Sequence, residues 1–241
     1  MRIDGRKPDQ LRKIITEMDY LDYPAGSCLI TFGKTRVLCA VNIENRVPHF
    51  LLGQGRGWLT AEYSMLPAAT KERTQREAKA GRLSGRTQEI RRLIGRSLRP
   101  VFDLSLVGER TFIIDCDVIQ ADGGTRTAAI NGAFLALYSA VKKMMVNREF
   151  PAFPITDFVA AVSVGIVNNE ILLDLCYEED CEAEIDMNLV MTGRGKMIEV
   201  QATAENLPVK RTEFNKMIDL GEQGIAQIIG LEKKLLGRNQ I

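Results

Sequence analysis

Residues 111 to 127 set the architecture of the chain and read Thr111-Phe112-Ile113-Ile114-Asp115-Cys116-Asp117-Val118-Ile119-Gln120-Ala121-Asp122-Gly123-Gly124-Thr125-Arg126-Thr127. Up to Gln120, apolar side chains recur at every second position with aspartates between them, which predicts a half-buried strand over Thr111–Gln120. After the glycine pair, apolar residues return at helical spacing from Ile130 to Met145. The stretch therefore predicts a strand that passes through a glycine-rich turn directly into a helix.

Further strands are expected before this unit. Ser27–Phe32 and Val37–Val41 are β-rich and flank a hairpin-like connection at 33–36. Glycines then alternate from Gly53 to Gly57, which is typical of backbone that is flexible or makes a close approach. The N-terminal part is thus predicted to consist mainly of strands.

The segment Thr70–Gly85 is rich in charge and poor in apolar residues, so we expect it to lie away from the core and to be mobile without a partner. Apolar residues recur at helical spacing over Arg86–Arg99. This predicts an amphipathic helix that begins near Ser84 or Gly85 and ends before Pro100.

The second half again begins with strands. The predicted strands are Phe158–Val167 and Ile171–Leu175, around an Asn-Asn turn, and Ala183–Val190. Thr212 is predicted to cap a last helix that has breaks at Gly221 and Gly224. This order of elements predicts an α/β chain of the α+β-like kind, with mixed β-sheets packed with helices and a single domain over residues 1–241.

The composition fits a globular protein and excludes several kinds of site. Of 241 residues, 45% are hydrophobic and 26% are charged. No apolar stretch approaches the roughly 18 residues of a membrane span, and we expect a cytoplasmic protein. Five cysteines form no CxxC pair and are expected to be reduced, and the one histidine, His49, excludes a multi-histidine metal site. Chemistry must rest on Asp, Glu, Arg and Lys.

A net charge of +1 hides a strong separation of charge along the chain. From Lys71 to Arg99 there are ten basic and three acidic residues, a local net of +7, whereas Asp174 to Asp186 holds seven carboxylates and no base. The basic segment is typical of a surface that binds a polyanion, although a solvated face has the same composition. The acidic segment offers hard oxygen ligands for Mg²⁺ or Mn²⁺, although acidic turns are also frequent on surfaces.

The turn at 123–126 places backbone N–H groups, a hydroxyl, a guanidinium and the positive end of a helix at one spot, which suits a phosphate-sized anion. Its spacing matches neither the P-loop nor the GxGxxG motif, and an ordinary strand-to-helix turn has the same pattern. Arg86, in the first turn of its helix, opposes the helix dipole unless an anion is bound. The alternative for Arg86 is a solvated surface position.

Asp180 and Asp186 can share a metal ion only if the chain turns between them, because a continuous strand of this length spans roughly 20 Å. If residues 179–181 form that turn, Asp174 falls opposite Asp186 across a hairpin. There the carboxylates would repel each other unless a cation is present.

These motifs, in this order, resemble the ribonuclease PH family from Arg2 to about Glu205. The resemblance is carried by Gly57-Trp58-Leu59-Thr60-Ala61-Glu62-Tyr63-Ser64-Met65-Leu66-Pro67, Gly85-Arg86-Thr87, Arg92-Leu93-Ile94-Gly95-Arg96, the run from Asp115 to Thr127, Tyr177-Glu178-Glu179-Asp180 and Asp186-Met187-Asn188. It implies a phosphorolytic 3′-to-5′ exoribonuclease in which inorganic phosphate attacks the last phosphodiester of transfer RNA precursors and reversibly releases nucleoside diphosphates. It also implies a homohexameric ring, built as a trimer of dimers.

The resemblance also assigns functional residues. It implies that phosphate is bound by Arg86, Gly124, Thr125 and Arg126, and that a divalent ion, Mg²⁺ or Mn²⁺, lies near Asp180 and Asp186. Both arginines and both aspartates are therefore catalytic candidates, with Asp180 either a base or a metal ligand. The RNA-binding candidates are Arg73, Arg76, Arg92 and Arg96.

Two other functions share part of this pattern. A non-catalytic RNA-binding ring subunit of the exosome type would lack the phosphate and metal positions, and a hydrolytic metal-dependent nuclease would need no phosphate cradle. The chain departs from the family at Leu52 and Ala68, where basic residues are usual, and at Ala202, where glycine is usual. We expect the first two to lower affinity for RNA and the third to affect only local backbone geometry.

Overall fold

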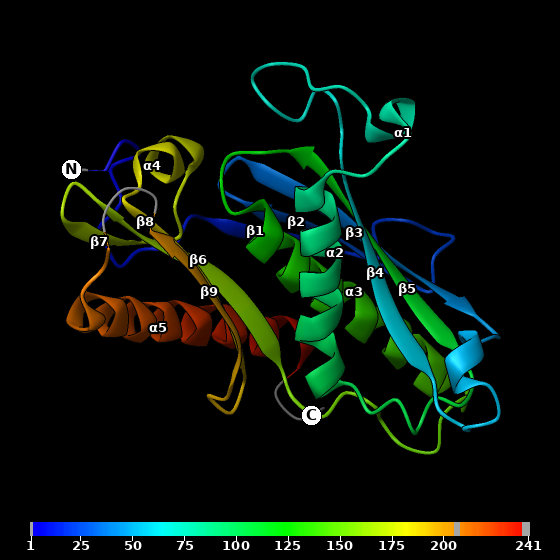
Figure 1. Cartoon of the computed structure of the whole chain (residues 1–241). Coiled ribbons are helices and arrows are strands. Elements are labelled where there is room, and N and C mark those ends of the chain that lie inside the picture. Colours follow the sequence, from blue (N-terminus) through cyan, green and yellow to red (C-terminus); the bar gives the residue numbers. More distant parts are fainter. Residues whose placement is uncertain (1, 205–207, 238–241) are drawn as a thin grey trace.

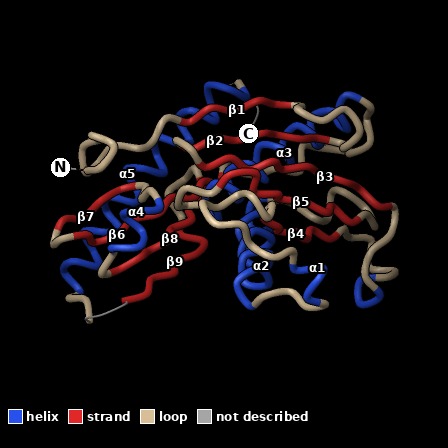
Figure 2. Tube along the Cα trace, turned by 90° about the horizontal axis from the view of Figure 1, so that it is seen from above, coloured by secondary structure: helices blue, strands red, loops and turns tan. Residues whose placement is uncertain are grey.

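The computed structural model describes residues 2–204 and 208–237. The first half of the chain builds a sheet with the strand order β1-β2-β3-β5-β4 (Figure 2). Its strands are β1 Ile14–Met18, β2 Gly26–Phe32, β3 Thr35–Glu44, β4 Trp58–Met65 and β5 Thr111–Gln120. β4 runs parallel to β5, and the other neighbours are antiparallel. The predicted hairpin and the predicted strand at 111–120 are confirmed.

The glycine alternation at 53–57 is explained within the chain itself. Gly53 and Gly55 have φ angles of 76° and 65°. A Cβ on Gly57 would lie 2.8 Å from the carbonyl oxygen of Arg110. The expected close approach is therefore confirmed as one between two segments of the same chain.

The second half builds a sheet with the order β7-β6-β8-β9, antiparallel throughout. Its strands are β6 Val159–Val167, β7 Glu170–Leu173, β8 Ile185–Thr192 and β9 Met197–Ala204. The turn before β7 has positive φ at Asn168 and Asn169, 51° and 62°, as expected for a tight hairpin. Every residue of β6 is buried, because α3 covers one of its faces and α5 the other.

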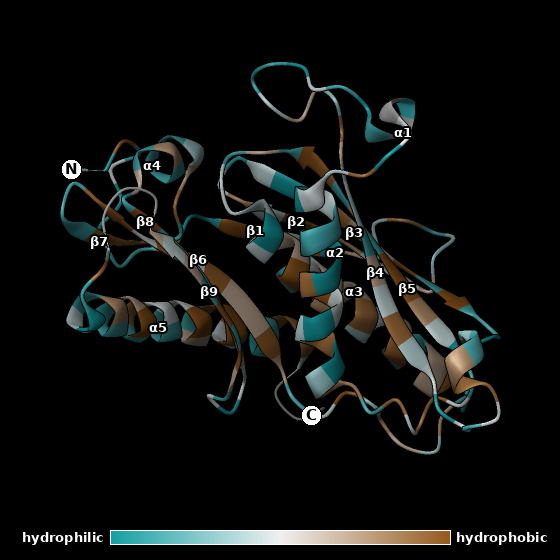
Figure 3. Ribbon diagram, viewed as in Figure 1, coloured by the Kyte–Doolittle hydropathy of each residue, from teal (hydrophilic) through white to brown (hydrophobic). Residues whose placement is uncertain are grey.

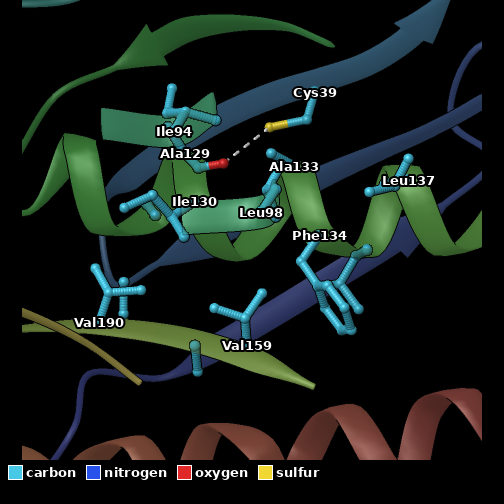
Figure 4. Close-up of a cluster of buried hydrophobic side chains, with 14 of the residues drawn as sticks. Cys39, Ile94, Leu98, Ala129, Ile130, Ala133, Phe134, Leu137, Val159 and Val190 are labelled. Carbon is cyan, nitrogen blue, oxygen red and sulfur yellow. Dashed lines mark hydrogen bonds between the residues drawn. The ribbon is translucent and has the colours of Figure 1, made fainter. Parts of the chain in front are cut away.

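The helices are α1 Glu77–Ala80, α2 Gly85–Leu98, α3 Thr125–Val146, α4 Tyr177–Glu182 and α5 Arg211–Leu236, with short 3₁₀ turns η1 His49–Leu51 and η2 Arg99–Val101. α3 lies between the sheets, against β2, β3 and β5 on one side and β6 on the other (Figure 1). In the core, Ile130 and Phe134 of α3 meet Leu98 of α2 and Val159 and Val190 of the second sheet (Figure 4). This mixed α/β architecture confirms the predicted fold class.

The charged segment before α2 lies outside the core. It forms an extended loop that carries α1 and stands away from both sheets, and most of its residues are hydrophilic (Figures 1 and 3). Ser84 caps α2, with its Oγ accepting a hydrogen bond from the Thr87 amide at 3.1 Å. Exposure of the segment and the start of α2 are confirmed, whereas the short α1 helix was not expected.

Three expectations for the second half are wrong. α5 begins at Arg211 with Lys210 as its N-cap, so Thr212 is inside the helix. α5 also runs unbroken through both glycines, because they face the second sheet, where a Cβ on Gly221 would lie 2.8 Å from the Leu189 side chain and one on Gly224 2.7 Å from Leu173. Helix-to-sheet contact, rather than a break, explains these glycines.

The third error concerns the hairpin proposed between Asp174 and Asp186. The residues between them form α4 rather than a simple turn, and β6 lies between β7 and β8. Asp186 pairs with Gly165 of β6, and Asp174 makes buried ion pairs elsewhere. The two carboxylates therefore do not face each other across a hairpin.

The described helices include none that is both long and apolar enough to span a membrane. In the same residues all five cysteines carry free thiols, as expected.

Candidate active site

The glycine-rich turn between β5 and α3 is held in a conformation that only glycine adopts easily. Gly123 and Gly124 have φ angles of 73° and 62°. A Cβ on Gly123 would lie 2.7 Å from the Leu175 carbonyl oxygen, so the turn packs directly against the segment that leads into α4. Thr35 Oγ1 donates to the Gly123 carbonyl at 2.7 Å and accepts from the Asp122 amide at 2.9 Å. The start of α3 is thereby fixed to both halves of the fold.

Buried ion pairs from the N-terminal segment lock the same region. Arg12 contacts the Asp174 carboxylate at 2.6 Å and donates to the Asp122 carbonyl at 2.6 Å. Arg2 contacts Glu179 of α4 at 2.6 Å. Although burial alone would raise the pKa of Glu179, the hydrogen bond and charge of Arg2 outweigh it, and that pKa is lowered. These pairs position the turn and α4 relative to each other.

The N-terminus of α3 presents backbone N–H groups at this turn. Gly124 is its N-cap residue, and no side chain in the described part of the protein caps it by hydrogen bonding. The Thr125 hydroxyl oxygen accepts a hydrogen bond at 3.0 Å from the hydroxyl of Tyr63, a buried residue of β4. No side-chain cap therefore competes for the backbone N–H groups of the first turn, the kind of donors that bind anions at helix N-termini.

Arg126 is held in place by two side chains from other elements. Its Nη1 donates to Gln201 Oε1 of β9 at 3.1 Å and lies 3.8 Å from Glu89 Oε1 of α2. Gln201 Nε2 in turn donates to Glu89 at 2.8 Å. We call Glu89 and Gln201 the Arg126 brace. It orients the guanidinium while joining α2, α3 and β9.

Asp186 lies where the charges of the region converge. The pKa of Asp186 is raised to about 6, by burial first and by the nearby Asp180 carboxylate second, against the opposing effects of Arg126, a hydrogen bond from Asn188 and Arg86. Burial also raises the pKa of Tyr63, against the effect of its bond to Thr125 and of the charges on Arg86 and Arg126. The fold thus brings both candidate arginines and Asp180 within electrostatic reach of Asp186.

Asp180 and Asp186 are the two side chains that the sequence predicts as ligands for a divalent ion. The described residues contain no group of three or more His, Cys, Asp or Glu side chains suited to hold a metal. A partly buried carboxylate that is destabilised by a second carboxylate nevertheless fits a hard cation with oxygen ligands. Such a site needs water and substrate oxygens to complete its coordination.

The RNA-binding candidates lie on the loop that carries α1 and on α2. Arg73 and Arg76 are exposed on the loop that carries α1, and Arg92 is exposed on α2. Arg96 makes an ion pair with Glu199 of β9 at 2.9 Å, so part of its charge is already neutralised. Lys71 joins the same loop to Glu178 of α4 at 2.8 Å.

The positions that depart from the family pattern lie on the surface. Leu52 is 56% exposed, and Ala68 is exposed at the start of the loop. Ala202 lies in regular register opposite Met187 in the second sheet, without a bulge at that pair.

Sequence reasoning did not find the Arg126 brace, Tyr63 or the buried ion pairs. A sequence signal existed only for Asp174, an acid inside the apolar run Leu172-Leu173-Asp174-Leu175. Arg2, Arg12 and Gln201 carry no such local signal, because their partners are remote in the sequence.

Comparisons with known proteins match the same family in both halves of the chain. Residues 10–143 match the model of the 3′ exoribonuclease family, domain 1, and residues 157–224 match domain 2 of that family. Ribonuclease PH of Moorella thermoacetica is 55% identical over 237 residues, covering 98% of this chain and 95% of that protein. Ribonuclease PH of Bacillus subtilis is 55% identical over 238 residues, covering 98% and 97%.

Solved structures of lower identity share the fold. An Archaeoglobus fulgidus exosome with RNA bound to the active site contains a chain that matches with a TM-score of 0.81 and 21% identity, covering 97% of this chain and 92% of that one. A chain of an archaeal exosome core matches with a TM-score of 0.75 and 20% identity, covering 97% and 90%. On the matches of both family domains and of the full-length relatives, this chain belongs to the ribonuclease PH group of the 3′ exoribonuclease family.

Proposed function

We propose that this protein trims the 3′ ends of transfer RNA precursors and that its reaction takes place where α2, α3, α4 and β8 meet. Family membership makes the protein a phosphate-dependent 3′-to-5′ exoribonuclease and a nucleotidyltransferase in the reverse direction, with inorganic phosphate as co-substrate. One observation is the main support for this location of the site. The Asp186 carboxyl is partly buried and interacts electrostatically with Asp180, Arg126 and Arg86 at once.

The phosphate is proposed to bind at the start of α3. Gly124 and Thr125 offer backbone donors there, and the positive helix end favours an anion. Arg126 is braced beside these donors, and Arg86 projects from the first turn of α2 toward the same region. Two guanidinium groups compensate the repulsion between the attacking phosphate and the RNA phosphodiester.

Asp180 and Asp186 are proposed to hold Mg²⁺ or Mn²⁺, with the remaining ligands supplied by water and phosphate oxygens. A divalent ion there supplies charge neutralisation at the phosphorus under attack. The raised pKa of Asp186 supports this assignment, because a cation would relieve both its burial and its repulsion from Asp180.

The proposed reaction is an in-line displacement. An oxygen of inorganic phosphate forms a bond to the phosphorus of the last phosphodiester, and the bond from that phosphorus to the 3′ oxygen of the preceding nucleotide breaks. The last nucleotide leaves as a nucleoside diphosphate, and the freed 3′ oxygen gains a proton. Asp180 acts either as the group that orients and deprotonates the phosphate or as a metal ligand only.

RNA outside the reaction centre is proposed to bind along the exposed arginines of the loop and of α2, namely Arg73, Arg76, Arg92 and Arg96. The structural likeness to an exosome chain described with RNA at its active site supports an RNA path on this fold. A homohexamer arranged as a trimer of dimers, a cytoplasmic location and a single domain over residues 1–241 belong to the same proposal. Buried residues of both halves form one continuous core, which supports the single domain.

The test is an incubation of a transfer RNA precursor that has extra 3′ nucleotides, with and without inorganic phosphate, followed by identification of the released nucleotides. We expect nucleoside diphosphates only when phosphate is present. Nucleoside monophosphates without phosphate would instead indicate a hydrolytic nuclease. RNA binding without any release of nucleotides would indicate a non-catalytic ring subunit.

A further inference from the structure

A cavity of about 310 Å³ lies between β1 and β2 of the first sheet, α3 and the C-terminal part of α5. Most of its wall is apolar and includes Ile14, Phe32, Leu135 and Ile228. The cavity shares no lining residue with the candidate active site. Its volume is at the lower end of the range for small-molecule pockets, roughly 300–1,000 Å³.

Glu232 of α5 is the unusual residue of this wall. It is only 3% exposed, and neither of its carboxylate oxygens has a hydrogen-bond partner among the described residues. Burial raises its pKa well above the ordinary value for glutamate. Glu232 also lies in the last turns of α5, where a negative charge opposes the helix dipole. Burial, lack of a partner and position in the helix all disfavour this carboxylate in the protein alone.

The other polar groups of the wall do not satisfy Glu232. The Asn131 side chain is directed to the second sheet, because it donates to the Ala161 carbonyl at 2.9 Å and accepts from the Ala161 amide at 2.8 Å, and it makes no hydrogen bond to Glu232 among the described residues. Lys234 is exposed and, within the described part of the chain, makes no ion pair with Glu232. Thr16 contributes one hydroxyl from β1. The wall therefore offers one unpaired acid in apolar surroundings.

We propose that this cavity binds a small organic cation, namely a primary ammonium group attached to a short aliphatic body. The ammonium supplies positive charge and hydrogen-bond donors to Glu232, and the aliphatic body covers the apolar wall. An anion would be repelled by an ionised Glu232, and a neutral apolar molecule would leave the acid unpaired. The chemistry of the wall thus selects a cation with an apolar tail.

This assignment predicts that binding releases a proton. Burial raises the pKa of the free carboxyl, so the free group keeps its proton to a higher pH than an ordinary glutamate, whereas the bound carboxylate must be charged. Among the described residues, Lys234 is the other ionisable group of the cavity wall, and Cys28 on β2 stays neutral because burial, with the nearby acids Asp19, Glu17 and Glu232, raises its pKa to about 12. Affinity for the cation should therefore rise about tenfold per pH unit until the free carboxyl ionises.

The experiment is calorimetric titration of the whole protein with butylammonium, and with 1-butanol as a neutral probe of similar size. We expect saturable butylammonium binding that is at least about tenfold weaker in Glu232→Gln, with equal response of both proteins to 1-butanol. Titration in two buffers of different ionisation enthalpy should detect the released proton. Equal butylammonium affinity in both proteins, or no saturable binding to the native protein, would overturn the proposal.

Further variants keep the test decisive. Leu135→Phe should block butylammonium by filling the cavity while Glu232 remains, which covers the case in which Glu232→Gln does not fold. Lys234→Ala should leave the affinity unchanged, and a tenfold tighter binding would mean that Lys234 itself occupies the cavity. A change in molecular mass by light scattering on adding butylammonium would mean that a basic side chain of a second copy occupies it, and would also overturn the proposal. RNA trimming by Glu232→Gln should match that of the native protein, because the cavity lies outside the reaction centre.

Discussion

The surroundings of Asp186 explain why its carboxyl has an unusual pKa. Its side chain lies on the face of the second sheet that also carries Asn188, which donates a hydrogen bond to it at 3.3 Å. Burial and the neighbouring Asp180 raise its pKa to about 6, against the ordinary 3.8. In the metal-free protein an ionised Asp186 is therefore a destabilising group near neutral pH.

The Asp186→Asn variant tests this at the level of the residue. Between about pH 4 and pH 6 the unfolded chain loses the Asp186 proton while the folded protein keeps it, so the free energy of unfolding falls as pH rises and stays lower above pH 6. Without divalent ions, we expect the variant to unfold with a free energy higher by on the order of 2 kcal/mol at pH 8 and unchanged near pH 3. Denaturant titrations at the two pH values measure this difference.

The same variant should lose most of its activity at any Mg²⁺ concentration, although it is as stable as the native protein or more so. Added Mg²⁺ should stabilise the native protein and not the variant. If the variant were less stable than the native protein at pH 8, Asp186 would be a structural residue rather than a metal ligand.

Among the elements, α2, α3 and β9 are joined by the Arg126 brace. Gln201→Ala removes the hydrogen bond to Arg126 at 3.1 Å and leaves Glu89 with only its longer ion-pair contact to Arg126 at 3.8 Å. We expect the KM for phosphate to rise about tenfold, equivalent to about 1.4 kcal/mol, with kcat at saturating phosphate close to native. Initial rates over a range of phosphate concentrations measure the two constants separately.

Two further variants show whether the brace acts by positioning Arg126. Glu89→Gln keeps a hydrogen-bonding side chain at that position and should raise the KM for phosphate less than Gln201→Ala does. Gln88→Ala, an exposed neighbour on α2, is the matched control and should change neither constant. A fall in kcat without a change in KM in Gln201→Ala would show that the brace does not serve phosphate binding.

The secondary-structure elements also show which parts of the fold could be predicted from the sequence. Strands and helices with a clear periodicity, such as Thr111–Gln120 and Gly85–Leu98, were predicted nearly to their ends, because local patterns determine them. The Gly123–Arg126 turn was also predictable, since its parts are contiguous. α4 and the continuity of α5 were not, because both depend on contacts with the second sheet. The brace likewise joins residues that are far apart in the sequence: Arg126 and Gln201 are separated by 75 positions, and Glu89 and Gln201 by 112. No local sequence pattern predicts such pairs.

At the scale of the whole molecule, the basic loop extends outward from the reaction centre (Figure 1) and is joined to it by the ion pair between Lys71 and Glu178 of α4. The loop carrying α1 stands away from both sheets, and its Ala68 is an exposed position where the family usually has arginine (Figure 1). Ala68→Arg should therefore lower the KM for transfer RNA precursors, and the slope of log K against log salt should steepen by about one unit per added phosphate contact. Filter binding over a series of salt concentrations measures this slope.

A control of equal charge separates a specific contact from a general increase in charge. Gln223→Arg adds the same charge on the exposed side of α5, away from the loop, and should change the slope less. Neither variant should alter the affinity for inorganic phosphate. If Ala68→Arg mainly tightened phosphate binding or raised kcat at saturating RNA, position 68 would belong to the reaction centre.

The division of the site into a phosphate cradle and a metal pair is tested most directly by the rate of phosphorolysis as a function of phosphate concentration. The comparison uses the native protein, Arg86→Ala, Arg126→Ala and Asp180→Asn. Each arginine variant should lose about 3 kcal/mol of transition-state stabilisation or more, roughly 100-fold in rate at limiting phosphate, and should recover part of it as phosphate is raised. Asp180→Asn should stay inactive at every phosphate concentration. Near-native rates of either arginine variant at limiting phosphate, or recovery of Asp180→Asn by phosphate alone, would contradict the assignment of the cradle to α2 and α3 and of the metal pair to α4 and β8.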